Sequence, residues 1–68
     1  MRKNLWELDR EDIVLLDGKK YKWKRDFKSK KPVLGLVVQR ELVNVENRKD
    51  RQRFIEDIDI GFVEVVNG

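Results

Sequence analysis

The segment that most restricts the fold of this chain runs from Lys19 to Lys31, KKYKWKRDFKSKK. It holds eight basic residues and one acid in thirteen positions. Its aromatic residues, Tyr21, Trp23 and Phe27, nearly alternate with polar ones. Because successive side chains of a strand point to opposite faces, the pattern predicts a strand with aromatics on one face. The opposite face would carry Lys20, Lys22, Lys24 and Lys28.

A hairpin turn directly precedes this segment. The Asp-Gly dipeptide at 17–18 tolerates the positive φ angles of a type I′ turn and is a strong hairpin signal. The apolar run Asp12–Leu16 would form the partner strand. A two-residue loop places Val14 opposite Tyr21, whereas a three-residue loop with a bulge places Leu15 there. In either register Tyr21 points to the core.

The chain is expected to form one domain, residues 1–68. It contains neither Cys nor His among its 68 residues, which excludes disulfides and the usual zinc ligands. Domains of this size are marginally stable alone, so a compact core or a partner must stabilise it. The nine Val and four Ile, with no Ala or Thr, favour strands over helices.

Cytoplasm is the expected compartment. The first residues lack the apolar run of a secretory leader, and no stretch approaches the roughly 18 apolar residues of a membrane span. We therefore predict no interaction with a membrane. A short lysine-rich domain of this kind would also suit a phage or another mobile element.

The remaining elements are predicted from shorter patterns. Residues 4–12 predict a short helical turn capped by an asparagine, and residues 28–32 predict a loop. The segment 33–38 is apolar on both faces and reads as a strand. Residues 47–58 fit either a strand centred on a Phe-Ile pair or a helix, and the strand is favoured. Residues 62–66 predict the last strand.

The apolar run Val33–Val38 allows two interpretations. It is either a central strand covered on both sides or a strand that lies in a subunit interface, and the first is favoured. Gly35 within it indicates a bend or a close backbone approach. The apolar residues change face after this run, which a bulge near Arg40-Glu41 would explain.

Five short strands with an early hairpin predict a small five-stranded antiparallel barrel. The segment Asp59–Val66, DIGFVEVV, resembles the end of an SH3-like barrel, in which one helical turn leads through an aromatic into the last strand. Of that family's peptide-binding positions, only Phe62 is matched. The resemblance therefore implies the fold, while other barrels of this shape bind RNA, DNA or ribosomes or serve as adaptors.

Enzymatic catalysis is not expected. Without Cys, His or Thr, and with Ser29 as the only serine, no catalytic triad can be assembled. No glycine-rich phosphate loop is present. Two acidic clusters, one in residues 9–12 and one in residues 56–59, read as solvated turn residues, and their spacing does not match a calcium loop. We predict no catalytic residue, no metal and no cofactor.

The charge distribution instead predicts a binding module. Residues 19–31 carry a net charge of +7 and the rest of the chain −4. Such a segment can follow a nucleic-acid backbone, with aromatic rings available for base stacking. The predicted contacts to RNA or DNA are Lys20, Lys22, Lys24, Lys28, Lys30 and Lys31 on phosphates, with Phe27 and Trp6 as stacking residues. The same lysines could simply keep one face solvated or dock an acidic protein.

The second hypothesis is a protein adaptor or a small subunit of a larger assembly. It depends on the two-sided apolar run Val33–Val38 and on the small core of a chain of this length. This interpretation predicts a protein partner or a homo-oligomer formed through Val33–Val38.

Overall fold

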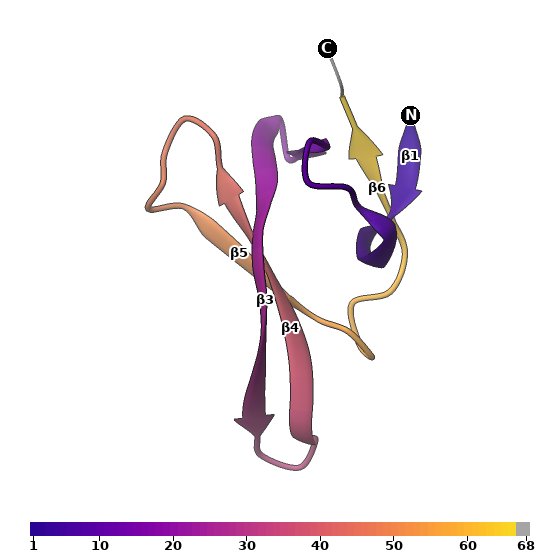
Figure 1. Ribbon diagram of the computed structural model, residues 1–68, viewed down its shortest axis with the longest axis vertical. Coiled ribbons are helices and arrows are strands. Elements are labelled where there is room, and N and C mark those ends of the chain that lie inside the picture. Colours follow the sequence, from indigo (N-terminus) through magenta and orange to yellow (C-terminus); the bar gives the residue numbers. More distant parts are fainter. Residues whose placement is uncertain (67–68) are drawn as a thin grey trace.

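The computed structural model describes residues 1–66 and shows a mainly β protein (Figure 1). In chain order the elements are β1 (Arg2–Asn4), a turn of 3-10 helix η1 (Leu5–Glu7), β2 (Ile13–Leu16), β3 (Lys19–Lys31), β4 (Gly35–Asn44), β5 (Arg51–Ile55) and β6 (Phe62–Val65). In the part of the chain that is described, no helix is long and apolar enough to span a membrane.

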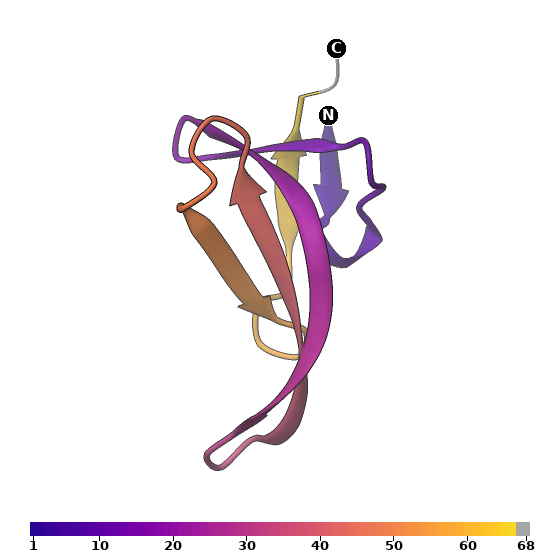
Figure 2. The same cartoon turned by 60° about the vertical axis from the view of Figure 1, so that its left-hand side comes forward.

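All six strands belong to one antiparallel sheet in the order β1-β6-β2-β3-β4-β5. The sheet curls strongly, and Figure 2 shows β3 bending across the molecule. The edge strands β1 and β5 do not pair within the described residues, so the sheet is not closed. The predicted five-stranded SH3-like barrel is therefore wrong in strand number and in closure, whereas the mainly β class is confirmed.

Two local features explain this difference. β1 is a three-residue strand of polar and charged residues that pairs with β6, and so short a segment carries no periodicity to detect. The open side between β5 and β6 is spanned by a turn segment, residues 56–61. That segment contributes single backbone bonds, such as Leu5 N–H to the Gly61 carbonyl at 3.1 Å, in place of a ladder.

The hairpin between β2 and β3 has the two-residue turn that the sequence predicts. Asp17 and Gly18 have φ angles of 50° and 76°, as a type I′ turn requires. Val14 pairs with Tyr21, so the first of the two predicted registers is confirmed. Both side chains are consequently buried at the centre of the core.

The core fills the inside of the curled sheet. Trp6, Leu16, Trp23, Phe54 and Val63 pack around its buried centre. That centre consists of Leu5, Leu8, Val14, Tyr21, Leu42 and Val65. We call the face of the sheet that carries these residues the inner face, and the opposite one the outer face. The predicted inward orientation of Tyr21 and Trp23 is confirmed.

The N-terminal helical turn is present but short. The Asn4 side chain accepts a hydrogen bond from Trp6 N–H at 2.9 Å and so caps η1, as expected. Leu5 and Leu8 are buried, so this turn contributes two side chains to the core. The turn ends after three residues, and the chain continues to β2 without further helix.

β3 and β4 are longer than predicted and extend beyond the rest of the sheet (Figure 1). Their ladder continues to the pair Lys31 and Gly35. The loop predicted at residues 28–32 is therefore wrong, because residues 28–31 belong to β3. Residues 35–38 do form part of a strand, as predicted, but that strand is not covered on both sides, since Leu36 is exposed. The physical reason is local: a tight turn at residues 32–34 lets two adjacent segments pair with each other without any tertiary support.

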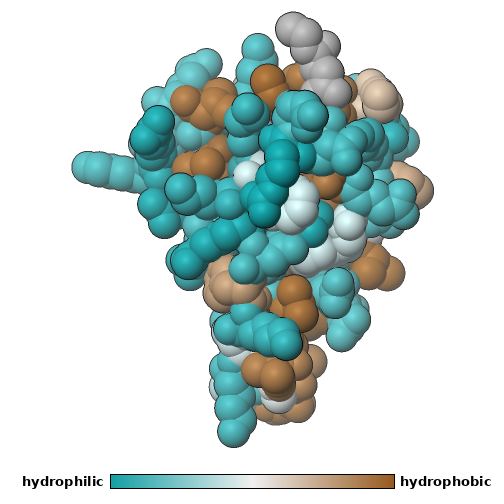
Figure 3. Space-filling model, viewed as in Figure 1, coloured by the Kyte–Doolittle hydropathy of each residue, from teal (hydrophilic) through white to brown (hydrophobic). Residues whose placement is uncertain are grey.

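We call residues 28–37 the basic arm, because this part of the hairpin has no third strand beside it. Its tip exposes apolar side chains: Val33 is 104% exposed, Leu36 70% and Leu34 49%. Figure 3 shows hydrophobic and hydrophilic atoms side by side on this projection.

A bulge in β3 reverses the orientation of the residues that follow it. Trp23 pairs with Leu42 and Arg25 pairs with Glu41, so Lys24 is an extra residue between them. The sequence predicts the bulge in the facing strand at the same level, and the structure places the additional residue in β3 instead.

The bulge changes which side chains share a face. Asp26 follows Trp23 onto the inner face, where it hydrogen-bonds to the indole Nε1 at 2.9 Å. Phe27 lies on the outer face and Lys28 on the inner face, in register with Gln39 and Val38. The prediction that Phe27 shares a face with the other aromatics is therefore wrong beyond the bulge, and so is the grouping of Lys28 with the earlier lysines.

β5 resolves the ambiguity at residues 47–58 in favour of a strand. Residues 51–55 pair with β4 along their whole length, and the alternative helix is wrong. The segment between β5 and β6 is a series of turns. The N–H groups of Ile58 and Asp59 donate to the Ile55 carbonyl at 3.1 and 2.8 Å, so the helical turn that the SH3 resemblance implies before the last strand is present as one turn that does not continue into a helix.

Arg40 is the central polar residue of the inner face. It is 6% exposed and lies between two indoles, with its guanidinium carbon 3.9 Å from the Trp23 centroid and 5.0 Å from that of Trp6. Its Nε and Nη2 donate to the Asp26 carboxylate at 2.8 and 2.9 Å, and its Nη1 donates to the Leu5 carbonyl at 2.9 Å. These hydrogen bonds lower the pKa of Asp26. Arg40 thus joins β3, β4 and η1.

Replacing Arg40 by alanine is expected to reduce the free energy of unfolding by about 2 kcal/mol, since the partly exposed Asp26 carboxylate loses its ion pair and the Leu5 carbonyl loses its buried donor. Arg10→Ala is the matched control, because Arg10 stacks at 3.9 Å on Trp23 but is exposed. Its loss should cost about 0.5 kcal/mol. Urea denaturation measures both values. Equal costs would contradict the central role of Arg40.

Candidate nucleic-acid interface

The outer face of β3, β4 and β5 collects basic side chains. The register aligns Lys22 with Val43 and Arg51 in one row across the strands. The next row aligns Arg25 with Glu41 and Arg53. We call this surface the basic face. Each row places cations on both sides of β4, and neighbouring strands are about 4.8 Å apart, so the positive charges are densely packed.

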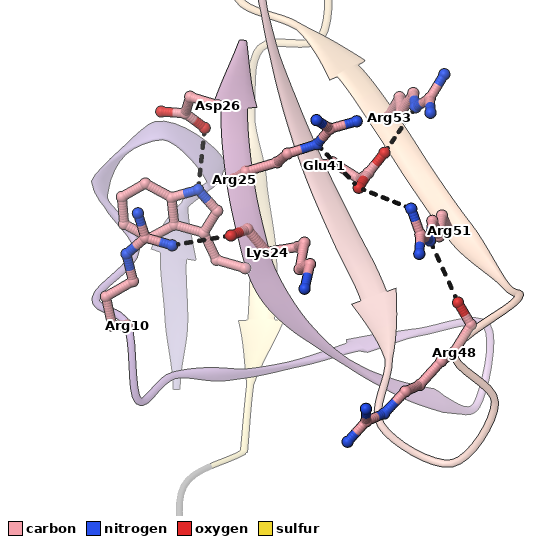
Figure 4. Close-up of polar contacts among 9 residues, drawn as sticks. Arg10, Lys24, Arg25, Asp26, Glu41, Arg48, Arg51 and Arg53 are labelled. Atoms are coloured by element: carbon pink, nitrogen blue, oxygen red, sulfur yellow. Dashed lines mark hydrogen bonds and ion pairs between the residues drawn. The ribbon is translucent and has the colours of Figure 1, made fainter.

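Glu41 lies at the centre of the basic face and is fully buried. It accepts hydrogen bonds from Nε of Arg53 at 2.8 Å and Nε of Arg25 at 3.3 Å. Arg51 forms an ion pair with it, Nη1 to Oε1, at 3.6 Å. Figure 4 shows the three arginines converging on this carboxylate. The hydrogen bond from Arg53 is the main cause that lowers the pKa of Glu41, and the hydrogen bond and charge of Arg25 add to it, although burial acts in the opposite direction.

The arginines nevertheless remain accessible. About half of each side chain is exposed: 52% for Arg25, 46% for Arg51 and 52% for Arg53. Because Arg25 and Arg53 bind Glu41 through Nε, their terminal nitrogens are oriented away from that bond and can meet a ligand. A buried acid therefore holds three arginines in place without covering them.

Phe27 contributes the aromatic surface of the basic face. The guanidinium carbons of Arg25 and Arg53 lie 4.8 and 5.5 Å from its ring centroid. The ring thus supports the two arginines by cation–π contact. An incoming base would meet the planar guanidinium groups as well as the ring, and bases stack on both.

A hollow of about 320 Å³ adjoins this cluster. Its charged lining consists of Lys22, Lys24, Arg48 and Arg51, and no acidic residue lines it among the described residues. Val43, Asn44 and Val45 complete the lining. An anion in the hollow would therefore be surrounded by four cationic side chains, and the rest of the lining is uncharged.

The loop after β4 positions Arg48 beside the hollow. Asn44 Oδ1 accepts the backbone N–H of Glu46 at 2.8 Å and of Asn47 at 3.2 Å, which tightens the turn. The Arg48 carbonyl accepts Nε of Arg51 at 3.3 Å (Figure 4). The loop and β5 are thus tied together on the side where both arginines emerge.

Asp50 anchors the same loop to the core. Its Oδ2 accepts the Tyr21 hydroxyl at 2.5 Å and Asn44 Nδ2 at 3.1 Å. The hydrogen bond with Tyr21 is the main cause that lowers the pKa of Asp50 and raises that of Tyr21. Tyr21 therefore has a structural role, with its ring in the core and its hydroxyl on the loop.

The structure brings together only part of the predicted binding set. Lys22 and Lys24 line the hollow, and Phe27 lies on the same face. By register, Lys20 and Lys31 are also on this face, at its two ends, whereas Lys28 and Lys30 emerge on the inner side of the basic arm. Trp6 packs on Arg40 across the sheet from the hollow, and its Nε1 donates to the Asp59 carbonyl at 2.9 Å.

Sequence reasoning missed the arginines of this site. Arg51 and Arg53 lie on one face of β5, and the alternating RQR pattern of the predicted strand was the available signal. Arg25 reaches this face only through the bulge, and Arg48 only through the loop fold. The role of Glu41 had no sequence signal, because its three partners come from two other strands.

Comparisons with protein-family models, with curated proteins and with solved structures give no match. Any function assigned to this chain therefore depends on the geometry and charge of the basic face. Within residues 1–66, no group of three or more acidic side chains is arranged to hold a metal ion.

Glu41→Gln should make the pH dependence of stability visible. The pKa of Glu41 is lower in the folded state than in the unfolded chain, where it is about 4.3. The ionised carboxylate therefore makes its full contribution to the free energy of unfolding at pH values above that unfolded-state pKa. That contribution is lost as the pH falls through the pKa of Glu41 in the folded state. The stability difference between wild type and Glu41→Gln should therefore be largest at neutral pH and shrink on acidification below about 4. Denaturation curves between pH 2 and 7 measure it. A pH-independent difference would contradict this assignment.

Proposed function

We propose that this protein is a non-catalytic module that binds RNA or DNA with little sequence preference through the basic face. The observation that supports this most is the hollow, whose charged lining is Lys22, Lys24, Arg48 and Arg51. Beside it, the carboxylate of Glu41 is buried beneath three arginines. The charged side chains that line the hollow are therefore all cations.

Phosphate groups match this surface in charge and in geometry. Guanidinium groups can bind phosphate oxygens with two parallel hydrogen bonds. Glu41 restricts Arg25 and Arg53 through Nε, so less rotamer freedom is lost when their terminal nitrogens bind. Lysines 22 and 24 add mobile point charges that suit a backbone of variable conformation. Contacts to phosphates do not depend on the base sequence, which explains why we propose binding with little sequence preference.

Base stacking would add to these contacts. The cluster of Phe27, Arg25 and Arg53 offers planar groups beside the hollow. Stacking on such groups is tolerant of sequence because every base has a π face. Trp6 is not part of this proposal, since it lies on the inner side. The lysines of the basic arm remain candidates for additional phosphate contacts on a longer strand.

Salt titration tests the proposed function. Fluorescence anisotropy with a short single-stranded RNA and a short DNA duplex should show affinity that falls steeply between about 50 and 200 mM salt. Lys22→Gln/Lys24→Gln should weaken binding about ten-fold or more and reduce the salt slope by about one per lost contact.

Arg2→Gln/Lys19→Gln is the matched control, because it removes the same charge outside the basic face. It should change the affinity by less than about three-fold, the effect of net charge alone. Equal losses in the two variants would show only diffuse attraction. Affinity that does not respond to salt would contradict a phosphate-binding surface.

A further inference from the structure

The basic arm is built to project from the molecule. β2 pairs with β3 only up to Lys22, and β5 pairs with β4 only down to Gln39. Residues 28–37 therefore form a two-stranded ribbon with a three-residue tip (Figure 2). Two-stranded ribbons are marginally stable in water on their own. The ribbon carries three lysines, Lys28, Lys30 and Lys31, and no acid.

The tip of the basic arm combines a strained backbone conformation with exposed apolar side chains. Val33 has a φ of 70°, a conformation that β-branched residues rarely adopt. Its side chain is completely exposed, so no packing within the chain offsets that strain. Leu34 and Leu36 are exposed beside it. Strained residues that add nothing to folding are typical of functional positions, and an apolar tip indicates an apolar receptor.

A receptor with these properties exists on the same molecule. A groove of about 190 Å³ lies where η1, β5 and β6 meet, and its lining is mostly apolar. It is formed by Leu5, Phe54, Asp59, Ile60, Gly61, Phe62 and Val63. We call it the acidic groove, because the adjoining segment 56–62 carries three acids and no base.

Apolar side chains also remain exposed around this groove. Ile60 is 78% exposed, Phe62 65% and Ile58 52%. Contiguous exposed apolar residues flanked by charges mark interaction sites. Glu56 and Asp57 are exposed in the segment that leads into the groove lining at Asp59, so their charges are available to a partner.

We propose that the basic arm of one copy docks into the acidic groove of a second copy. The arm carries +3 and the segment at the groove carries −3, and both combine that charge with exposed aliphatic side chains. No residue of the arm lines the groove of its own chain. The contact joins two different surfaces and is therefore head-to-tail, so it produces a ring or a filament and not a two-fold dimer.

The contact should be weak and sensitive to salt. A hairpin tip in a small groove falls below the roughly 1,200 Å² of standard protein interfaces. Part of the attraction is between exposed charges, which salt screens over about 8 Å at physiological ionic strength. Self-association should therefore be measured at protein concentrations of hundreds of micromolar, without nucleic acid.

Sedimentation equilibrium of three proteins tests this proposal. The arm variant is Val33→Asn/Leu34→Ser, and asparagine suits the positive φ so the turn is kept. The groove variant is Glu56→Lys/Asp57→Lys/Ile60→Ser. Wild type should form species that grow with concentration. Each variant should show a self-association constant at least ten-fold weaker. An equimolar mixture of the two should form a heterodimer and nothing larger, because it retains one intact arm and one intact groove.

Glu11→Lys/Glu46→Lys is the control for charge, since both acids are exposed away from the groove. It should self-associate as the wild type does. Circular dichroism of every variant checks that the fold is retained. A wild type that stays monomeric at about 1 mM would falsify the proposal. It would also be overturned if the arm variant self-associated normally, or if the mixture gave no heterodimer.

Discussion

The ion pair of Arg40 with Asp26, enclosed by two tryptophans, is the interaction on which the arrangement of the sheet depends. Asp26 can face Arg40 only because Lys24 is an extra residue in β3. In a regular strand Trp23 and Asp26 would lie on opposite faces. The bulge therefore provides the buried guanidinium of Arg40 with a carboxylate partner. The desolvation of a buried guanidinium is costly, so its partners must be placed accurately, and this requirement fixes the register of β3 against β4.

The same bulge decides what the outer face can do. By moving Asp26 inward it removes the only acid of the β3 segment from that face and brings Arg25 and Phe27 onto it. Glu41 then compensates the arginines from below, where it does not reach the surface. Negative charge is thus placed where it organises the arginines without being presented to an external anion itself, although it offsets part of their positive charge. The acid–arginine clusters on the two faces, Asp26 with Arg40 and Glu41 with its arginines, both depend on this one irregularity.

Much of the fold could be predicted from the chain. The Asp-Gly turn, the alternation in β3 and the apolar runs predicted strands at five of the six observed positions, a hairpin with two possible registers, and the inward orientation of Tyr21 and Trp23. The length of the basic arm could not be predicted, because an apolar run that pairs locally in a projecting hairpin has the same composition as a buried one. The prediction of a closed barrel was wrong for a related reason. Closure depends on whether the two edge strands of the sheet, β1 and β5, pair with each other, and residues 56–61 form turns on the open side instead.

For the candidate site, the sequence by itself determined the charge of the β3 segment, the absence of Cys, His and Thr, and the position of Lys22 and Lys24 on one face. These properties are local, since they depend on composition and on a period of two. Tertiary structure decided which cations share a surface. Arg25, Arg51 and Arg53 meet because one residue is inserted in β3 and because β5 pairs beside β4. Strand order and a single bulge depend on the whole packed sheet, and so no local pattern encodes them.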